Sequence, residues 1–389
     1  MATTFIVNPG STSRKYALYK DGVCANVFFC EATGGGYCMS IIENGVKISE
    51  KKLTATEFSH SASAAVAYIV QKGAVASVQA ITHVVIRVVA PGTYFTTHRT
   101  IDAEYVAKLK QIEDVAPLHV PGLIDEIKAV AKALPDAALF GISDSAFHTT
   151  IPEHVSTISI PRADALKFDI KRFGYHGLSF ASIARRLEVQ FGAVPERTIV
   201  LHIGGGVSVG ALKNGKCIAT SMGYSPVSGM IMGSRGGDIT AGVVAALTVF
   251  KKLRGKKLYE YLYKESGFKG VSGVSDLRLV LERKALGDPD AILAVNMFVH
   301  ELHSWIGAHV ATLGGLDAVV LTATASERNP DLRKLILSNL SVFDIEIDDV
   351  KNNDAIGRES FLHPDESNVR IAVMKTDEMG EIDKIIQSL

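Results

Sequence analysis

The chain has 389 residues, of which 47% are hydrophobic and 21% charged, a balance that is ordinary for globular proteins. Lys and Arg together number 41, and so do Asp and Glu, so the formal net charge is zero. This neutrality argues against general binding to nucleic acids or membrane surfaces. Any anionic ligand must therefore be held by local cations.

The cysteines, Cys24, Cys30, Cys38 and Cys217, form no Cys-x-x-Cys pair and no zinc-like array with histidine. Their pattern favours a reduced cytoplasmic protein over a disulfide scaffold. The first residues lack the pattern of a signal peptide, and the most apolar stretches are too short or too interrupted to span a bilayer.

Predicted strands and helices alternate along the chain, which indicates an α/β fold with helices packed on the faces of sheets. We expect strands over residues 4–7, 16–19, 83–89, 138–142, 198–203, 207–212 and 318–322. We expect helices over residues 62–71, 103–112, 121–134, 180–191, 240–254, 291–313 and 329–340.

One pattern occurs twice, about half the chain apart: an apolar strand, a loop of small residues, a second strand and a hairpin turn. The first copy has its loop at residues 8–13 and its turn at Asp21-Gly22, and the second has them at 204–206 and Asn214-Gly215. Backbone N–H groups in such loops can approach an anion closely. The repeat predicts two similar domains, residues 1–148 and 149–389, that share an active-site cleft.

The first loop fits either an anion site or an ordinary turn, although Lys15 adds a positive charge beside it. Arg87 lies inside an apolar run and needs an anionic partner, either a protein carboxylate or a ligand. We favour the ligand, because Ala90-Pro91-Gly92 ends the strand and places Arg87 near a strand end. Asp144, just past another strand, suits either a metal or a helix cap.

Two further motifs place reactive side chains between glycines. His176 lies between Gly174 and Gly177, which favours a backbone that exposes its ring to a cleft over a simply packed ring. Arg235 lies in a glycine-bracketed loop at residues 229–238, which suits phosphate binding better than an Arg–Asp pair in a flexible loop.

Together these motifs resemble the acetate kinase family, the short-chain carboxylate kinases of the sugar kinase and actin superfamily. The phosphate loops look closer to the butyrate kinase branch. The matching blocks are residues 8–15, 87–92, 116–119, 144–148, 172–179, 202–208, 220–223, 233–238, 266–278, 314–317 and 376–378.

The resemblance assigns roles to matching residues. The implied catalytic residues are Arg87, Asp144, His176, Arg235 and His119. The residues implied to face the donor are Asn8, Ser11, Ser13, Lys15, His202, Gly204, Gly205, Gly206, Ala323 and Thr324. The implied acyl pocket is Val89, Leu118, Tyr175 and Pro226. The implied magnesium ligands are Asn8, Asp144 and Glu378.

The resemblance further implies two actin-like domains, with the last helix packed back on the first, and a homodimer. The implied reaction is a reversible phosphoryl transfer between ATP and a short-chain carboxylate such as acetate, giving ADP and an acyl phosphate, with Mg²⁺. A carboxylate is already ionised at neutral pH, so the reaction needs cations rather than a strong base.

Three alternatives remain open. Residues 323–328 carry side chains where the family has a glycine-rich adenosine motif, so pyrophosphate could replace ATP, as in a relative that also lacks this motif. A non-catalytic nucleotide-binding member would not need both arginines together with His176 and Asp144. A kinase for an alcohol would need a carboxylate base near the acceptor.

Overall fold

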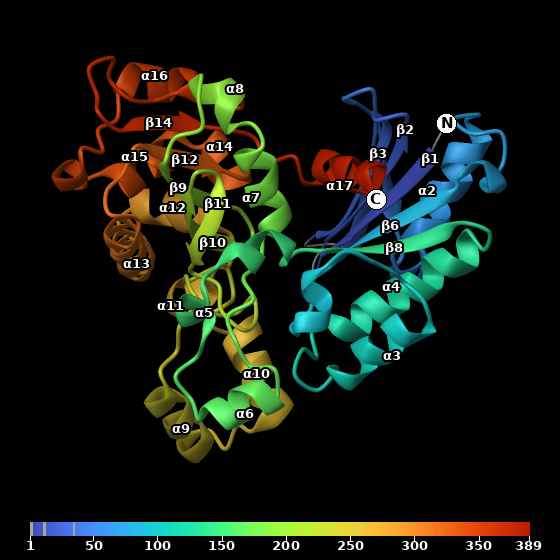
Figure 1. Ribbon diagram of the computed structural model, residues 1–389, viewed down its shortest axis with the longest axis horizontal. Coiled ribbons are helices and arrows are strands. Elements are labelled where there is room, and N and C mark those ends of the chain that lie inside the picture. The colour runs from blue at the N-terminus through green and yellow to red at the C-terminus, as the bar shows by residue number, and fades with distance from the viewer. Residues whose placement is uncertain (1–2, 11–12, 34–35) are drawn as a thin grey trace. The chain divides into compact units, whose positions relative to one another are not determined.

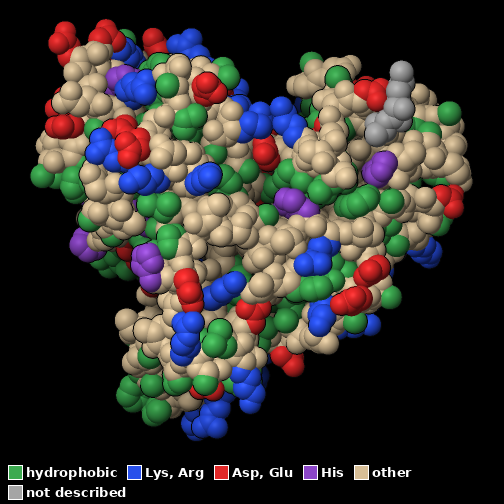
Figure 2. All heavy atoms as spheres, in the orientation of Figure 1, with side chains coloured by type: hydrophobic (Ala, Val, Ile, Leu, Met, Phe, Trp, Pro, Cys, Tyr) green, Lys and Arg blue, Asp and Glu red, His purple; other side chains and the backbone are tan. Residues whose placement is uncertain are grey.

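The computed structural model describes residues 3–10, 13–33 and 36–389 (Figure 1). The chain divides into two compact units, which we call unit 1 (Met1–Ala146 with Asp377–Leu389) and unit 2 (Phe147–Thr376). Each unit is built on its own sheet. Acidic and basic side chains are interspersed on the face shown in Figure 2, as the zero net charge leads one to expect.

The sheet of unit 1 has the strand order β5-β4-β3-β2-β1-β6-β8-β7. Its strands are β1 (Thr3–Pro9), β2 (Ser13–Lys20), β3 (Val23–Thr33), β4 (Gly36–Glu43), β5 (Val46–Leu53), β6 (His83–Val88), β7 (Arg99–Thr100) and β8 (Ala138–Ser143). Strands β1, β6 and β8 run parallel, whereas β1 to β5 form an antiparallel meander.

Helices cover both faces of the central strands in unit 1. The helices of this unit are α1 (Ala55–Ser59), α2 (Ser61–Gln71), α3 (Ala103–Gln111), α4 (Val120–Ala133) and α17 (Glu378–Ser388). Helices α4 and α17 both pack against β1 and β6, from opposite sides in Figure 1. Both faces of β1 are buried: Phe5 and Val7 join the core cluster that also holds Ile124 of α4, and Ile6, which points to the opposite face, is buried as well.

The sheet of unit 2 has the strand order β11-β10-β9-β12-β14-β13. Its strands are β9 (Arg197–Ile203), β10 (Val207–Lys213), β11 (Lys216–Thr220), β12 (Ala318–Thr322), β13 (Ser360–Phe361) and β14 (Arg370–Val373). Strand β12 consists entirely of buried residues, as expected for a parallel strand with helices on both faces.

Unit 2 contains most of the helices. They are α5 (Glu153–Ser156), α6 (Arg162–Lys167), α7 (Gly177–Ala184), α8 (Leu187–Phe191), α9 (Ala241–Phe250), α10 (Gly255–Lys264), α11 (Gly267–Ser272), α12 (Leu277–Ala285), α13 (Pro289–Leu313), α14 (Thr324–Arg328), α15 (Pro330–Leu337) and α16 (Asp349–Asp354). Short 3₁₀ turns are η1 (Val78–Ala80) and η2 (Thr93–Thr96) in unit 1, η3 (Ala146–Thr150) at the boundary, and η4 (Ser341–Phe343) in unit 2. The long helix α13 packs on β9 and β10.

The duplicated pattern of the sequence is a duplicated topology. The order β3-β2-β1-β6-β8 in unit 1 has the same strand directions as β11-β10-β9-β12-β14 in unit 2. Both hairpin turns use two left-handed residues, with φ of 47° and 81° at Asp21-Gly22 and 51° and 74° at Asn214-Gly215. This conformation matches the twist of antiparallel strands, so the turn prediction is confirmed.

The expected strands are all present, but two helix predictions differ from the structure. The helix expected over residues 240–254 ends at Phe250. Residues 180–191 form two helices, α7 and α8, rather than one. The Arg186 N–H donates to the carbonyl of Ile183, only three residues back, and the Arg186 guanidinium donates to the carbonyl of Ser182. This tighter turn interrupts the helix. No glycine or proline lies at this point, so the sequence does not indicate the interruption.

Candidate active site

The first glycine-rich loop follows β1, which ends at Pro9, and β2 begins at Ser13. The Gly10 N–H donates to the Ser13 carbonyl at 2.7 Å, and a Cβ on Gly10 would lie 2.8 Å from that same oxygen. The close turn therefore requires glycine. Lys15 is the register partner of Asn8 across the hairpin. Ser11, an expected donor contact, lies outside the described residues.

Three expected site residues of unit 1 meet at the carboxyl edge of its parallel strands. Asn8, Arg87 and Asp144 lie at or just beyond the ends of β1, β6 and β8, which are neighbours in the sheet. Arg87 binds Asp144 through two hydrogen bonds, Nε to Oδ1 at 3.0 Å and Nη2 to Oδ2 at 2.9 Å. The carboxyl edge of a parallel sheet is where α/β proteins usually bind ligands.

Helix α17 adds a fourth group to this cluster. The Arg87 Nη1 donates to Asn8 Oδ1 at 3.1 Å and to Glu378 Oε2 at 3.4 Å, and Asn8 Nδ2 donates to the same Glu378 oxygen at 2.9 Å. The Asp144 carboxylate is 1% exposed, compared with 14% for Arg87 and 17% for Glu378. We call Asn8, Arg87, Asp144 and Glu378 the Arg87 cluster.

The partner that we expected for Arg87 was a ligand, and this expectation needs correction. The guanidinium pairs with two protein carboxylates, because the parallel pairing of β6 with β8 places Asp144 beside it. Burial alone would lower the pKa of Arg87, but Asp144 and then Glu378 outweigh that effect and raise it. Arg87 is therefore a permanent cation in a group whose carboxylates outnumber it.

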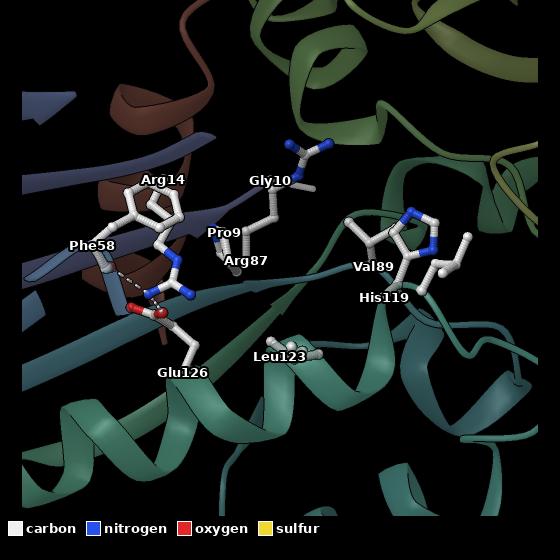
Figure 3. A pocket seen from close by; sticks show the side chains of 11 residues that line it. Pro9, Gly10, Arg14, Phe58, Arg87, Val89, His119, Leu123 and Glu126 are labelled. Atoms are coloured by element: carbon white, nitrogen blue, oxygen red, sulfur yellow. Dashed lines mark hydrogen bonds and ion pairs between the residues drawn. The ribbon is translucent and has the colours of Figure 1, made fainter. Parts of the chain in front are cut away.

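A cavity of about 160 Å³ opens beside Arg87 in unit 1. Val89 and Leu118, both expected in the acyl pocket, line it together with His119, which immediately precedes helix α4 (Figure 3). Val89 and His119 lie together at one end of the cavity in this view. This end thus combines apolar side chains with an imidazole, and Arg87 also lines the cavity.

In unit 2, the two expected histidines stack on each other. The rings of His176 and His202 have centroids 4.1 Å apart and planes inclined by 25°. His176 Nδ1 lies 2.9 Å from Ser208 Oγ, and His202 Nδ1 lies 2.8 Å from Ser179 Oγ, so each ring is held by a serine. His176 has φ of 59°, a left-handed conformation that places its ring beside β9 and β10.

At the second glycine-rich loop, residues 204–206, His176 lies close to Arg235. A Cβ on Gly206 would lie 2.7 Å from His176 Nε2 and 3.7 Å from Arg235 Nη1. Only glycine fits between these groups. Arg235 is positioned by Tyr263, whose hydroxyl accepts from Nη2 at 3.0 Å and whose ring lies 4.7 Å below the guanidinium. Among the described residues, no carboxylate forms an ion pair with Arg235.

The segment after β12 contacts the same loop. Ala323 has φ of 71° and ψ of 163°, a conformation that glycine adopts almost alone. Its methyl group lies 3.3 Å from the position of a Cβ on Gly204. Thr324 then begins helix α14, and Gly205 has open space around it. The side chain of Ala323 therefore reduces the free space beside the loop at Gly204.

The other two expected acyl-pocket residues lie in unit 2. Tyr175 is 1% exposed, and its hydroxyl donates to the carbonyl of Tyr224 at 2.7 Å. The Pro226 carbonyl accepts from Arg235 Nη1 at 3.3 Å. Pro226 is thus connected to the arginine of the site, whereas Tyr175 is anchored by a buried hydrogen bond.

Several residues that shape these groups were not found from the sequence. Ser208 and Ser179 hold the two histidines, and both lie inside motifs that we had singled out for other residues. Tyr263 lies in α10, a helix that we did not predict, and only a structure reveals its stacking on Arg235.

Two searches gave negative results for the described part of the chain. No group of three or more His, Cys, Asp or Glu residues there could hold a metal ion. No helix described in the structure is both long and apolar enough to cross a bilayer.

Comparison with solved structures defines the class of protein. The acetate kinase of Porphyromonas gingivalis is 30% identical, covers 100% of this chain and 99% of its own, and superimposes with a TM-score of 0.86. A propionate kinase of Francisella tularensis is 28% identical, with 98% of both chains covered and a TM-score of 0.88. The fold is therefore that of short-chain carboxylate kinases, with two similar actin-like domains.

Sequence comparison identifies the family. The pattern of the Acetokinase family matches residues 3–384. An acetate kinase of Phocaeicola vulgatus is 33% identical in an alignment 386 residues long that covers 96% of each chain. The chain belongs to the acetokinase family. It is an acetate kinase-like phosphotransferase that acts on the carboxyl group of a short-chain acid.

Proposed function

We propose that the enzyme transfers a phosphoryl group reversibly between ATP and an unbranched carboxylate of about two to four carbons. The observation that carries the proposal is the meeting of His176 Nε2 and Arg235 Nη1 at Gly206. Two nitrogen-bearing side chains and a loop free of side chains lie together there. Such a constellation suits the charge that spreads over the oxygens of a phosphoryl group in transfer.

Arg87 and Arg235 have different environments, so we assign them different roles. Arg235 has no carboxylate partner among the described residues, so its positive charge is available to a phosphoryl group or a substrate carboxylate. Arg87 is paired with two carboxylates at the edge of the unit 1 sheet, and the Nη2 N–H group that these pairs leave over would hold the substrate carboxylate beside His119. His176 would stabilise the transferring phosphoryl group, and His119 would support the substrate end of the cavity.

The Arg87 cluster fits a magnesium ion. Its one guanidinium and two carboxylates leave an excess negative charge, and Asn8 adds an amide oxygen. Mg²⁺ prefers such oxygen ligands and usually keeps water and substrate phosphates in its remaining positions. Asp144, Glu378 and Asn8 would hold the ion, which neutralises phosphate charge when bound.

The donor phosphates are proposed to contact the two glycine-rich loops. Ser13 and Lys15 border the first loop, and His202 adjoins the Gly204–Gly206 loop. Backbone N–H groups and a nearby cation bind phosphate without the need for a nucleoside contact. Units 1 and 2 are proposed to be the two domains of the enzyme, with Ala323 and Thr324 facing the nucleoside.

A second candidate donor, pyrophosphate, is favoured by one observation. The methyl group of Ala323, held in a conformation suited to glycine, adjoins Gly204 and reduces the space for a nucleoside. The test is a matched assay: purified enzyme with acetate and Mg²⁺, supplied with ATP or pyrophosphate, and acyl phosphate trapped by hydroxylamine. Product with ATP supports the proposal. If acyl phosphate forms with pyrophosphate but not with ATP, the donor is pyrophosphate. If acyl phosphate forms with neither donor, the proposed function is wrong.

We also propose a cytoplasmic homodimer. Helix α9 is apolar along its length yet has no buried residue, and Phe250 at its end is 85% exposed. An unpartnered apolar helix of this kind suits an interface. All the cysteines are free, which suits a reducing compartment. Light scattering after size exclusion tests the dimer, and Phe250→Asp should yield the monomer.

A further inference from the structure

The cavity beside Arg87 continues beyond the expected acyl pocket. From Val89 and Leu118 it extends past Gly122 and Leu123 of helix α4 to a wall formed by Arg14, Phe58 and Glu126. Figure 3 shows Arg14 and Glu126 at the opposite side of the pocket from His119 and Val89.

The cavity is larger than a two-carbon acid requires. Its volume is about 160 Å³, whereas a single water molecule needs roughly 10–15 Å³ on this measure. Gly122 lines the cavity and is exposed, so the cavity is open to solvent there, and a Cβ placed on Gly122 would meet nothing within 4 Å. The pocket therefore has space for a chain that passes Gly122 toward the far wall.

The far wall is a polar pair at the edge of an apolar core. Arg14 Nη1 lies 3.1 Å from Glu126 Oε2, and the Glu126 side chain is 2% exposed. Glu126 Oε1 accepts from the Tyr16 hydroxyl at 2.8 Å. Burial raises the pKa of Glu126, although Arg14 and Tyr16 act in the opposite direction. Buried ion pairs contribute little to stability compared with apolar packing, so stability alone gives a weak reason for this one.

Arg14 has hydrogen-bonding capacity to spare. Its contacts with the Phe58 carbonyl, the Ser59 carbonyl and Glu126 all use Nη1. Within the described residues, Nε and Nη2 have no partner. A guanidinium has five N–H donors, so Arg14 can donate to a ligand in the cavity without losing its structural contacts.

We propose that this cavity selects a carboxylate whose chain ends in a hydroxyl group, with Arg14 donating to that hydroxyl and Glu126 accepting from it. The inference rests on the proposed function, because it takes Arg87 and His119 as the end that holds the reacting carboxylate. The substrate class is then a short hydroxyalkanoate rather than acetate alone.

The charges of the wall explain why a hydroxyl is selected. Arg14 and Glu126 together carry no net charge, and they offer one donor and one acceptor. A hydroxyl group both donates and accepts. A second carboxylate would meet Glu126, an ammonium group would meet Arg14, and a methyl group would leave the polar pair without a partner.

The test compares acids that differ only at the end of the chain. The pairs are 3-hydroxypropanoate with butanoate and 4-hydroxybutanoate with pentanoate, in which a methyl group replaces the hydroxyl. Succinate and 4-aminobutanoate provide charged ends. In at least one pair we expect kcat/KM for the hydroxy acid to exceed that of its methyl counterpart about tenfold or more, the scale of one hydrogen bond to a charged group.

Two variants connect this preference to the wall. The double variant Arg14→Met/Glu126→Gln removes both charges together, so it leaves no unpaired buried ion, and it should reduce the preference to about one. Gly122→Leu should block the route and lower the ratio of hydroxy acid to acetate activity. Lys128→Leu is the control, because Lys128 is an exposed residue of the same helix and is not among the residues that line the cavity.

Binding measured by calorimetry with the same acids separates this inference from the proposed function. If acetate is phosphorylated but neither hydroxy acid is preferred in turnover or binding, the inference is wrong and the function stands. A preference for succinate or 4-aminobutanoate also overturns it. If no acid is phosphorylated but the hydroxy acid still binds preferentially, the function is wrong and the pocket assignment stands.

Discussion

The guanidinium of Arg87 and the carboxylate of Asp144 face each other in a two-bond pair, with distances of 3.0 Å and 2.9 Å. Arg235 has the contrasting environment of an aromatic ring, a hydroxyl and a carbonyl. The two arginines should therefore respond differently to removal, although both belong to the proposed machinery.

We expect Arg87→Ala to lose both stability and turnover. The change leaves the Asp144 carboxylate buried without its cation, a loss on the order of 3–5 kcal/mol when one partner of a buried pair is removed. Urea unfolding of the variant measures this loss, and hydroxylamine trapping measures turnover. Wild-type stability in Arg87→Ala would show that the pair is exposed to solvent and does not organise the cluster.

We expect Arg235→Ala to lose turnover with little change in stability. Its removal leaves no buried carboxylate unpaired, but it removes a cation from the proposed phosphoryl site. The loss in kcat should be on the order of 10²-fold or more. Turnover near that of the wild type in a folded Arg235→Ala enzyme would contradict the site assignment.

The His176 imidazole can be removed without disturbing its backbone. Asparagine tolerates the left-handed conformation of this position, so His176→Asn should fold normally. We expect a loss of turnover on the order of 10²-fold, because a preorganised hydrogen-bond donor is lost. Ser208→Ala, which removes the partner of Nδ1, should cause a smaller loss. Circular dichroism checks that both variants fold, and hydroxylamine trapping compares their turnover with that of the wild type. Equal activity in all three proteins would rule out the role assigned to His176.

Much of this site could be predicted from the sequence, because its residues follow strands. The apolar strands placed Arg87 and Asp144 at or just past strand ends and Asn8 in the loop after the first strand, and the structure brings all three to one sheet edge. The pairing of Arg87 with Asp144 could not be predicted, since it depends on which parallel strands are neighbours. Glu378 was found only through the family resemblance, because it begins a helix remote in sequence from the strands it packs on.

The fold was least predictable where the strands are exposed. Strand β5 is exposed at every residue except Leu53, so it lacks the buried alternating face that identifies a strand. It forms because β4 offers an antiparallel edge and the Asn44-Gly45 turn returns the chain. Such an edge strand depends on its neighbour more than on its own composition.

His309 predicts a pH dependence of stability in unit 2. Burial lowers its pKa to about 4, while a hydrogen bond with the Val209 carbonyl, 3.3 Å from Nε2, acts in the opposite direction. A histidine whose pKa is lowered on folding stabilises the protein above its ordinary pKa of about 6.5, and this stabilisation is lost as the pH falls toward 4.

The corresponding experiment compares wild type and His309→Gln by urea unfolding at pH 7 and pH 5. Glutamine retains a donor for the Val209 carbonyl but does not titrate. Between these pH values the wild type should lose about 2 kcal/mol more than the variant. A difference between the two proteins that does not change with pH would show that His309 is solvated or charged in the folded state.

The donor can be tested through the strain at Ala323. A residue other than glycine with φ of 71° and ψ of 163° carries a cost on the order of 1–3 kcal/mol. Ala323→Gly removes that cost, but glycine also increases the conformational entropy of the unfolded chain, which lowers the free energy of unfolding by about 0.4–1 kcal/mol. We therefore expect a net gain of about 1 kcal/mol in the free energy of unfolding.

The same change should discriminate between donors. Ala323→Gly removes the methyl group beside Gly204, so kcat/KM for ATP should rise while that for pyrophosphate stays the same. Ala325→Gly, inside helix α14, is the control: it should lower stability by about 1 kcal/mol without changing the donor preference. Adenosine should compete with ATP in the wild type. ATP would be wrong as the donor if the enzyme turns over robustly with pyrophosphate but with no nucleotide, and if adenosine has no effect. The predictions for Arg235 and His176 would remain unchanged.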